Sequence, residues 1–349
     1  MEYRDKYDVV IVGAGPGGLR CAEVLGASGK NVLIIEKNEM IGPKICAGGL
    51  TRKAISYLHN IGMPEDIIEN TFDGIVFRKG GMRTRINFGS IFLYTINRKN
   101  LGQWQLGKLH DMKNVAVSSG TMVTKITKEH VIIGKSQKIQ YDFLVGADGS
   151  NSIVRRFLGI PTKRLGVAYQ YIMPLSKKFS DIEIIFESNL FHAWYAWIFP
   201  YAKTLSIGTG YFPKIMPAEK SKKKFMKWLD KEKISIENVP MEAHPINCDY
   251  RGHHFGNVFL AGDAAGATSG FSGEGIYQAL IFGGEIAQII LNPQHKSKKI
   301  SEVLREKRIH EAMLLFLILS GPFRNCIFYL VVSAVRIPWC GRILLRIMS

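Results

Sequence analysis

The 349-residue sequence is poor in the residues that build metal centres and disulfide frameworks. It contains five cysteines, and no two of them have a Cys-x-x-Cys spacing. Its nine histidines include no His-Glu-x-x-His pattern. An odd number of unpaired cysteines without a secretory segment favours reduced thiols in the cytoplasm. We therefore expect free thiols and no metal ion.

The sequence also lacks internal repeats and low-complexity tracts. Residues 1–7 are charged, and the apolar run after them leads directly into a glycine turn, so no signal peptide is expected. No apolar run reaches the roughly 20 residues that span a bilayer as a helix. Near the end of the chain, 312–323 and 326–335 are apolar but are interrupted by Pro322 and Arg324. These segments predict a helical tail that lies on a membrane or caps the neighbouring domain, in preference to a single span.

Acidic residues are scarce: 29 stand against 46 basic ones, which gives a net charge of +17. No nucleic-acid-binding motif accompanies this excess, so nucleic acid is not an expected partner. An anionic membrane surface or a phosphorylated lipid explains the charge better, and Arg336, Arg342 and Arg346 flank apolar residues near the end of the chain. The basic segment 220–229 is either an interfacial helix or a solvated helix whose apolar side packs on the protein. We expect a cytoplasmic protein, peripheral on the inner face of the membrane.

Glycine turns are the most informative feature that the sequence does contain. Val9–Val12 are apolar β-formers that predict a buried strand, and a Gly-x-Gly-x-x-Gly turn follows them. Its first glycine permits a tight turn, its second lets the backbone approach a pyrophosphate, and its third lets the next helix pack closely. The candidate cofactor-binding residues of this turn are Gly13, Ala14, Gly15, Pro16 and Gly18.

A second predicted strand, 31–35, ends at Glu36 and Lys37. A carboxylate at this distance from the glycine turn accepts hydrogen bonds from ribose hydroxyls. Strand, helix, second strand and Glu36 together predict a nucleotide-binding unit in preference to a glycine-rich turn without a ligand.

Two later segments repeat the pattern of a strand that runs into a glycine turn. The first leads to Asp148 within Gly-Ala-Asp-Gly, and the second leads to Gly262 and Asp263 and continues to Gly275 and Ile276. Asp263 can accept a hydrogen bond from a ribityl hydroxyl, while the helix start after it faces a phosphate. Turns so far apart in one chain indicate that it closes twice on one extended cofactor, a flavin dinucleotide more than a nicotinamide one.

In this combination the turns resemble those of the flavoprotein hydroxylase superfamily, which binds FAD. The resemblance covers most of residues 5–290. It implies that FAD is the cofactor, that Arg98 holds the flavin, and that the backbone at Val123 packs on the adenine.

Two further segments are similar to geranylgeranyl reductases within this superfamily. Residues 44–50 resemble their Cys-x-Gly-Gly loop, and the Tyr-x-Trp-x-Phe-Pro segment at 195–200 resembles their substrate-side signature. On this resemblance the chain is identified as a member of the geranylgeranyl reductase family. The loop then supplies Lys44 and Ala47 as cofactor contacts and Gly48 and Gly49 as substrate contacts.

Alkene reduction gives these segments separate tasks. An isolated C=C bond needs a hydride, which reduced flavin delivers, and a proton from a nearby acid. Cys46 is the candidate catalytic residue, with proton donation, redox chemistry and packing as a small buried hydrophobe all open. Tyr195, Trp197 and Phe199 share one face if they lie on a strand. Such a wall suits a prenyl chain, although an ordinary half-buried sheet has the same pattern.

The expected fold is α/β: a Rossmann-like FAD-binding domain interleaved with a mainly antiparallel β-sheet substrate domain, followed by a helical tail. We assign residues 1–70, 97–160 and 250–295 to the FAD-binding domain, residues 71–96 and 161–249 to the substrate domain, and residues 296–349 to the tail.

The resemblance implies an FAD-dependent reductase that hydrogenates C=C bonds of polyprenyl (geranylgeranyl) groups in lipids or diphosphates, with NAD(P)H or ferredoxin as electron donor. One alternative is an FAD-dependent monooxygenase that acts on an aromatic or other hydrophobic substrate. Another is a flavin-containing, membrane-associated binding protein without turnover. The loop around Cys46 and the segment 195–200 favour the reductase.

Overall fold

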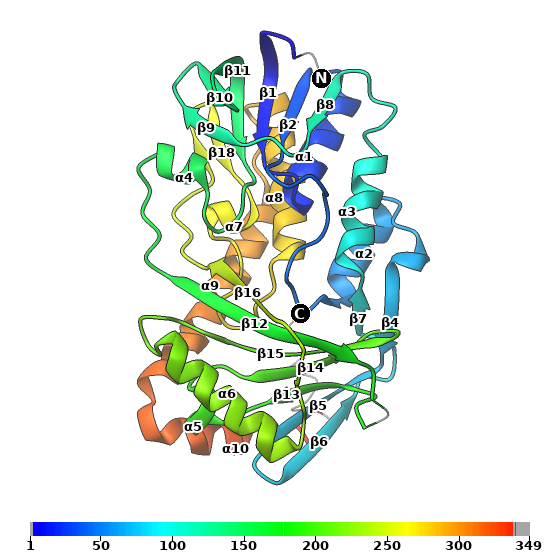
Figure 1. The fold of residues 1–349 in the computed structure, drawn as a ribbon, viewed down its shortest axis with the longest axis vertical. Coiled ribbons are helices and arrows are strands. Elements are labelled where there is room, and N and C mark those ends of the chain that lie inside the picture. Colours follow the sequence, from blue (N-terminus) through cyan, green and yellow to red (C-terminus); the bar gives the residue numbers. More distant parts are fainter. Residues whose placement is uncertain (1–2, 177, 338, 340–349) are drawn as a thin grey trace.

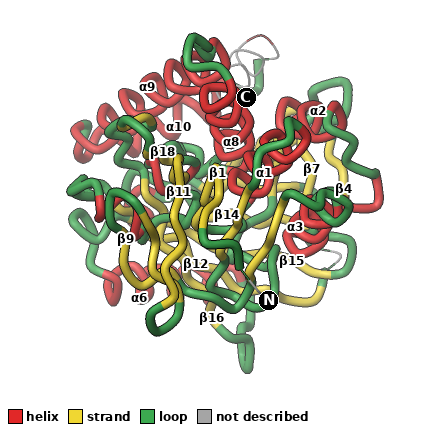
Figure 2. Tube along the Cα trace, turned by 90° about the horizontal axis from the view of Figure 1, so that it is seen from above, coloured by secondary structure: helices red, strands yellow, loops and turns green. Residues whose placement is uncertain are grey.

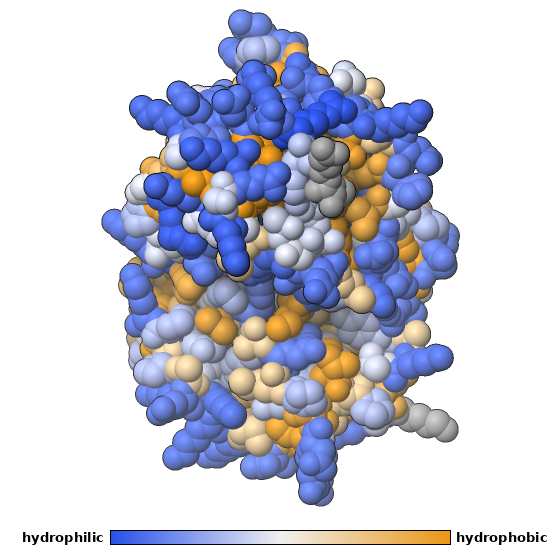
Figure 3. Space-filling view, turned by 45° about the horizontal axis from the view of Figure 1, so that its top comes forward, coloured by the Kyte–Doolittle hydropathy of each residue, from blue (hydrophilic) through white to orange (hydrophobic). Residues whose placement is uncertain are grey.

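The computed structural model describes residues 3–176, 178–337 and 339 and has the expected α/β fold. An eight-stranded sheet with its helices forms one end of the molecule, and a seven-stranded sheet forms the other (Figure 1). Hydrophilic residues dominate the surface over the eight-stranded sheet, with apolar patches between them (Figure 3). Two of the basic residues noted above, Arg342 and Arg346, lie outside the described residues.

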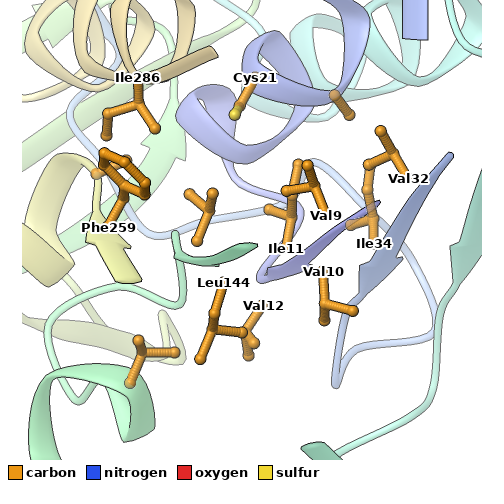
Figure 4. Close-up of a cluster of buried hydrophobic side chains, with 14 of the residues drawn as sticks. Val9, Val10, Ile11, Val12, Cys21, Val32, Ile34, Leu144, Phe259 and Ile286 are labelled. Atoms are coloured by element: carbon orange, nitrogen blue, oxygen red, sulfur yellow. The ribbon is translucent and has the colours of Figure 1, made fainter. Parts of the chain in front are cut away.

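The eight-stranded sheet is parallel at its centre and buried on both faces. Its order is β17-β18-β11-β1-β2-β8, and β10 and β9 extend it from β11. Val9 and Ile11 point toward the helix that carries Cys21, whereas Val10 and Val12 point to the opposite side (Figure 4). Burial on both faces is what a continuous run of apolar β-formers predicts. The strands are β1 (Lys6–Val12), β2 (Val32–Ile35), β8 (Val115–Ser118), β9 (Val123–Ile126), β10 (His130–Ile133), β11 (Gln137–Gly146), β17 (His254–Phe255) and β18 (Val258–Leu260).

Two helices bring the distant glycine segments together. Helix α1 (Pro16–Ala27) packs against α8 (Ile276–Leu291) at glycine positions. A Cβ atom on Gly17 would lie 2.7 Å from the Ala279 carbonyl oxygen, and one on Gly283 would lie 2.0 Å from the Gly17 carbonyl oxygen. This contact therefore needs glycine on both helices. The remaining helices near this sheet are α3 (Arg98–Gly107), α4 (Ile153–Phe157) and α7 (Gly262–Ala265).

The seven-stranded sheet has the order β16-β12-β15-β14-β13-β5-β6 and is antiparallel except between β13 and β5. Helix α6 (Ala218–Glu232) covers one face, where Phe225, Trp228 and Leu229 are buried. The basic segment 220–229 thus packs its apolar side on the protein, the second of its two interpretations. The strands are β5 (Gly74–Lys79), β6 (Met82–Asn87), β12 (Leu165–Pro174), β13 (Ile182–Ile185), β14 (Ala196–Pro200), β15 (Thr204–Tyr211) and β16 (Met241–Asn247).

A three-stranded sheet lies between the two larger ones and was not foreseen. Its strand order is β3-β7-β4. The Cys46 loop leads directly into this sheet, because β3 begins at Gly49. Of residues 71–96, assigned above to the antiparallel sheet, β5 and β6 join it, whereas β7 pairs with β3. The elements are β3 (Gly49–Thr51), β4 (Ile68–Phe72), β7 (Leu93–Ile96), α2 (Arg52–Asn60) and the 3₁₀ turn Glu65–Ile67.

The last elements of the described residues form a helical hairpin: α9 (Lys298–Leu319), a 3₁₀ turn (Gly321–Phe323) and α10 (Arg324–Ala334). Helix α10 contacts β5, β6 and the short helix α5 (Ser188–Phe191), and its Phe328 ring stacks on Phe186 at 4.8 Å. Figure 2 shows α9 and α10 together on one side of the sheets. No single described helix is long and apolar enough to cross a bilayer, but α9 and Gly321–Ala334, bent by 112°, pass that test as a pair.

Candidate active site

A cavity of about 280 Å³ lies where the two large sheets meet. The glycine turns border it on one side, the Cys46 loop on another, and strands of the seven-stranded sheet on the third. Among the predicted site residues, the cavity is lined by Gly15, Pro16, Lys44, Cys46, Ala47, Gly48, Gly49, Arg98, Tyr195, Trp197, Phe199, Gly262, Asp263, Gly275 and Ile276. The others, Gly13, Ala14, Gly18, Glu36, Lys37, Val123 and Asp148, do not line it.

The glycines of the first turn are needed for different physical reasons. Gly13 has a φ of +101°, and a Cβ atom there would lie 2.4 Å from the Ala147 carbonyl oxygen. A Cβ atom on Gly18 would lie 2.1 Å from the Gly13 carbonyl oxygen. Gly15 has an ordinary φ of −74°, and its Cβ would meet no protein atom closer than 3.8 Å. The fold thus requires Gly13 and Gly18, whereas the bare backbone at Gly15 leaves room for an approaching pyrophosphate.

Glu36 lies beyond the cavity and braces the first turn. One carboxylate oxygen accepts a hydrogen bond from the Ala14 amide at 2.8 Å, and the other accepts one from the Asn38 amide at 3.0 Å. Each oxygen keeps a lone pair that ribose hydroxyls can use. Lys37 beside it is exposed, and the side chain of Val123 is buried in the core.

Asp263 is the most heavily hydrogen-bonded carboxylate at the cavity. It forms an ion pair with Lys44 at 3.0 Å and accepts hydrogen bonds from Ser150 and Thr268. Burial opposes ionisation of Asp263, but Lys44 and these hydroxyl donors together lower its pKa below the ordinary value. The group is therefore an ionised acceptor, as binding of a ribityl hydroxyl requires.

Arg98 begins α3, directly after Asn97, whose side chain caps that helix. Arg98 lines the cavity, and its Nε is buried without a hydrogen-bond partner among the described residues. An unpaired buried donor that faces a cavity is costly unless a ligand accepts from it. The open backbone at Gly15 and the unpaired donor on Arg98 thus fit an FAD with its phosphates at α1 and its flavin near α3.

Asp148, a predicted cofactor contact, does not line the cavity. Its Oδ2 accepts a hydrogen bond from the Ile153 amide at 2.6 Å, at the start of α4. Burial raises the pKa of this carboxyl, against the opposing hydrogen bonds. Its neighbours Ala147 and Gly149 line the cavity instead.

The Cys46 loop is clamped onto the seven-stranded sheet. Cys46 Sγ accepts a hydrogen bond from the Gly48 amide at 3.3 Å, and the Tyr201 hydroxyl donates to the Ala47 carbonyl at 2.7 Å. A Cβ atom on Gly48, where φ is +65°, would lie 2.2 Å from the Tyr201 hydroxyl. One on Gly49 would lie 2.5 Å from the Phe199 ring. Within the structure, the two glycines serve to let these rings pack on the loop.

The aromatic wall faces the cavity as one surface. Tyr195, Trp197 and Phe199 line it beside apolar residues of β5 and β13. Trp197 donates through its indole nitrogen to Ser206 at 3.0 Å, and the Tyr195 hydroxyl donates to the Ser272 carbonyl at 2.7 Å. Burial raises the pKa of Tyr195 to about 12, so its hydroxyl stays neutral. Because the Trp197 indole N–H and the Tyr195 hydroxyl both donate to protein groups, these side chains present mainly apolar ring surface to the cavity.

The cavity-lining residues that sequence reasoning missed include the polar side chains of Thr51, Gln170, His244 and Glu274. Burial, with Lys44 nearby, lowers the pKa of His244 to about 4. His244 and Gln170 lie on β16 and β12, where no motif marks them. Only Glu274 had a signal, its place in Gly-Glu-Gly-Ile between two predicted cofactor contacts.

Comparison with known proteins agrees with this geometry. Residues 6–196 match the FAD binding domain family. An uncharacterised protein of Methanosarcina barkeri is 31% identical, over 82% of this chain and 74% of its own length. The digeranylgeranylglycerophospholipid reductase of Methanocaldococcus jannaschii is 27% identical, over 82% of this chain and 78% of its own length.

A solved structure has the same fold. It is a geranylgeranyl bacteriochlorophyll reductase-like protein from Thermoplasma acidophilum, which superposes with a TM-score of 0.80 at 18% identity and covers 95% of this chain and 91% of its own.

Proposed function

The chain belongs to the FAD-dependent oxidoreductases of the geranylgeranyl reductase family, and from this premise we propose that it hydrogenates C=C bonds of geranylgeranyl groups in a lipid or a diphosphate. The observation that carries the proposal is the single cavity in which the glycine turns and the aromatic wall meet. A cofactor ring and a prenyl chain in that cavity would lie side by side.

In this proposal, one group of residues binds the cofactor, and another binds the prenyl chain and excludes water. Gly15, Arg98 and Asp263 would hold the phosphates, the flavin and the ribityl chain of a bound FAD, and Glu36 would hold its ribose. When bound and reduced, FAD would supply the hydride for the alkene. The wall of Tyr195, Trp197 and Phe199 aligns the prenyl chain and keeps water from the reacting carbons.

The proposal is tested by anaerobic incubation of the reduced holoenzyme with digeranylgeranylglycerol phospholipid and, separately, with geranylgeranyl diphosphate. Mass spectrometry should show a gain of two hydrogens for each bond reduced in at least one of them. Recovery of both substrates unchanged, from protein that carries flavin, would contradict the proposal and favour a binding protein. A product that gains oxygen only in aerated buffer would favour the monooxygenase.

We also propose that the protein acts as a peripheral protein on an anionic membrane surface, where its lipid substrate resides. The observation in support is an apolar surface on the carboxyl-terminal hairpin, here called the hairpin surface. Its residues are 55% to 74% exposed, and they are Leu315, Phe316, Leu319, Phe323 and Leu330. Helix α6, whose exposed side carries lysines, adjoins α5, and α5 adjoins α10 (Figure 1). Apolar residues flanked by lysines are typical of attachment to anionic lipid.

Vesicle flotation tests the attachment. The protein should float with vesicles that contain anionic phospholipid, and the Leu319→Ser/Phe323→Ser variant should remain in the bottom fraction. Met122→Ser is the matched control, because Met122 is 59% exposed and lies on the eight-stranded sheet's side of the molecule. Flotation of the double variant at the wild-type level would contradict the proposed surface.

A further inference from the structure

Hydrogenation of an isolated alkene needs a proton at one carbon, and few groups at the cavity can supply it. Lys44 and Asp263 are paired with each other, and the Tyr195 hydroxyl already donates to a backbone carbonyl. The guanidinium of Arg98 does not give up its proton in proteins. His244, with a pKa of about 4, holds no proton to give at neutral pH. Among the cavity-lining residues so far described, Cys46 and Glu274 remain.

Glu274 lies where three parts of the site converge. Its carboxylate accepts a hydrogen bond from Thr51 on β3 at 3.3 Å and one from Gln278 on α8 at 3.1 Å. Thr51 follows the Cys46 loop on β3, so the two candidate groups approach the cavity from neighbouring segments. The turn that carries Glu274 is fixed from the other side, because Tyr195 donates to the Ser272 carbonyl.

The surroundings of Glu274 favour a protonated carboxyl. Burial raises its pKa, against hydrogen bonds from Gln278 and Thr51 and the charge of Lys53 on α2. Glu306 on α9 and Tyr277 on α8 also face this region. Among the described residues no ion pair reaches Glu274, and Lys53 pairs with Glu306. A carboxyl whose pKa is raised by burial beside a reaction cavity is suited to act as a general acid.

We propose that Glu274 is the catalytic acid of the reduction. Hydride adds to one alkene carbon, and Glu274 protonates the other. This assignment rests on the function proposed above. The bond between the carboxyl oxygen and its proton breaks, and a C–H bond forms with the π electrons of the alkene. The carboxylate that remains takes up a proton from water. The nearby Lys53–Glu306 pair is partly open to solvent, since its side chains are 27% and 37% exposed.

Cys46 then has a different task from proton donation. Its sulfur accepts a hydrogen bond from the Gly48 amide and packs against the core around Leu50. The thiol shapes the loop that faces the reacting carbons. The two assignments differ in which variant abolishes the proton transfer.

The test compares three variants at equal flavin content. Glu274→Gln should lower single-turnover hydrogenation roughly 100-fold or more, the range general acids contribute. Glu274→Asp should restore part of that rate, since it returns a carboxyl. Glu285→Gln, on helix α8 that follows Glu274 and away from the cavity, is the control that should keep the wild-type rate.

The pH profile separates a proton donor from a structural residue. The wild-type rate should fall as pH rises through the pKa of Glu274, and this limb should be absent in Glu274→Gln and still present in Cys46→Ser. Loss of the limb in Cys46→Ser with retention in Glu274→Gln would overturn the assignment in favour of Cys46.

A measurement on flavin-free protein is independent of turnover. The infrared difference spectrum of wild type minus Glu274→Gln at neutral pH should contain the C=O band of a protonated carboxylic acid. A carboxylate band in its place would overturn the assignment. If wild-type holoenzyme reduces no prenyl substrate, the proposed function fails. If it does and Glu274→Gln stays within about threefold of it, the role of Glu274 alone fails.

Discussion

The first glycine turn and the aromatic wall face the same cavity but arise in different ways. The turn is local: Val12, Gly13, Gly15 and Gly18 fix its path within seven residues of one another. The wall is assembled from distant segments, because Trp197 rests on Gly208 and Ser206, and Phe199 rests on Gly49. The glycine turn follows from the backbone conformation of neighbouring residues, whereas the aromatic wall depends on tertiary packing.

The comparison is sharpest within the turn itself. The fold requires glycine at position 13, because a Cβ atom there would lie 2.4 Å from the Ala147 carbonyl oxygen. It does not require glycine at position 15, where a Cβ atom would lie 3.8 Å from the same oxygen. A glycine that the fold does not need is best explained by the ligand.

The largest effect is therefore expected for Gly15→Ala. The protein should keep its wild-type unfolding midpoint while its affinity for FAD falls about 10- to 100-fold, because a methyl group pressed on a phosphate costs about 1–3 kcal/mol. Fluorescence titration of flavin-free protein measures this. Gly107→Ala, also in open space, is the control that should bind FAD normally. Normal FAD affinity in Gly15→Ala would break the contrast between Gly13 and Gly15.

A smaller effect is expected on the wall. Trp197→Phe removes the donor to Ser206 and shortens the surface offered to the prenyl chain, so KM should rise about tenfold with FAD affinity unchanged. Trp228→Phe is the matched control, since Trp228 packs on the opposite face of the same sheet. Equal KM changes in the two variants would show that the wall acts through general stability.

The smallest effect concerns pH and compares the cavity with the surface. Burial holds the pKa of His244 at about 4, below its ordinary 6.5. Between these values the unfolded chain binds a proton that the folded protein excludes, so the free energy of unfolding should fall as pH falls from about 6.5 to about 4.

Urea unfolding of flavin-free protein across this range measures the slope. His244→Gln should make it shallower, and His110→Gln, at an exposed position, should not. An unchanged slope in His244→Gln would mean that His244 titrates alike in both states.

The sequence predicted the class of fold and the position of the nucleotide turn, because strand pattern and glycine spacing are local properties. It did not reveal the three-stranded sheet that joins β3 to β7, since that pairing links segments about 45 residues apart that carry no shared motif. For the same reason, the positions of His244 and Gln170 at the cavity were not predicted. Asp148 shows the converse limit: the motif marked the turn, but the side chain accepts a hydrogen bond from the first amide of α4.

A crystal structure of the holoenzyme with a saturated geranylgeranyl-lipid analogue would test the central claim most directly, namely that one cavity joins the flavin to the aromatic wall. We predict that the flavin lies at Arg98 and the Cys46 loop, and that the prenyl chain lies along Tyr195, Trp197 and Phe199. A prenyl chain bound away from this wall, or a flavin separated from it by protein, would contradict the account.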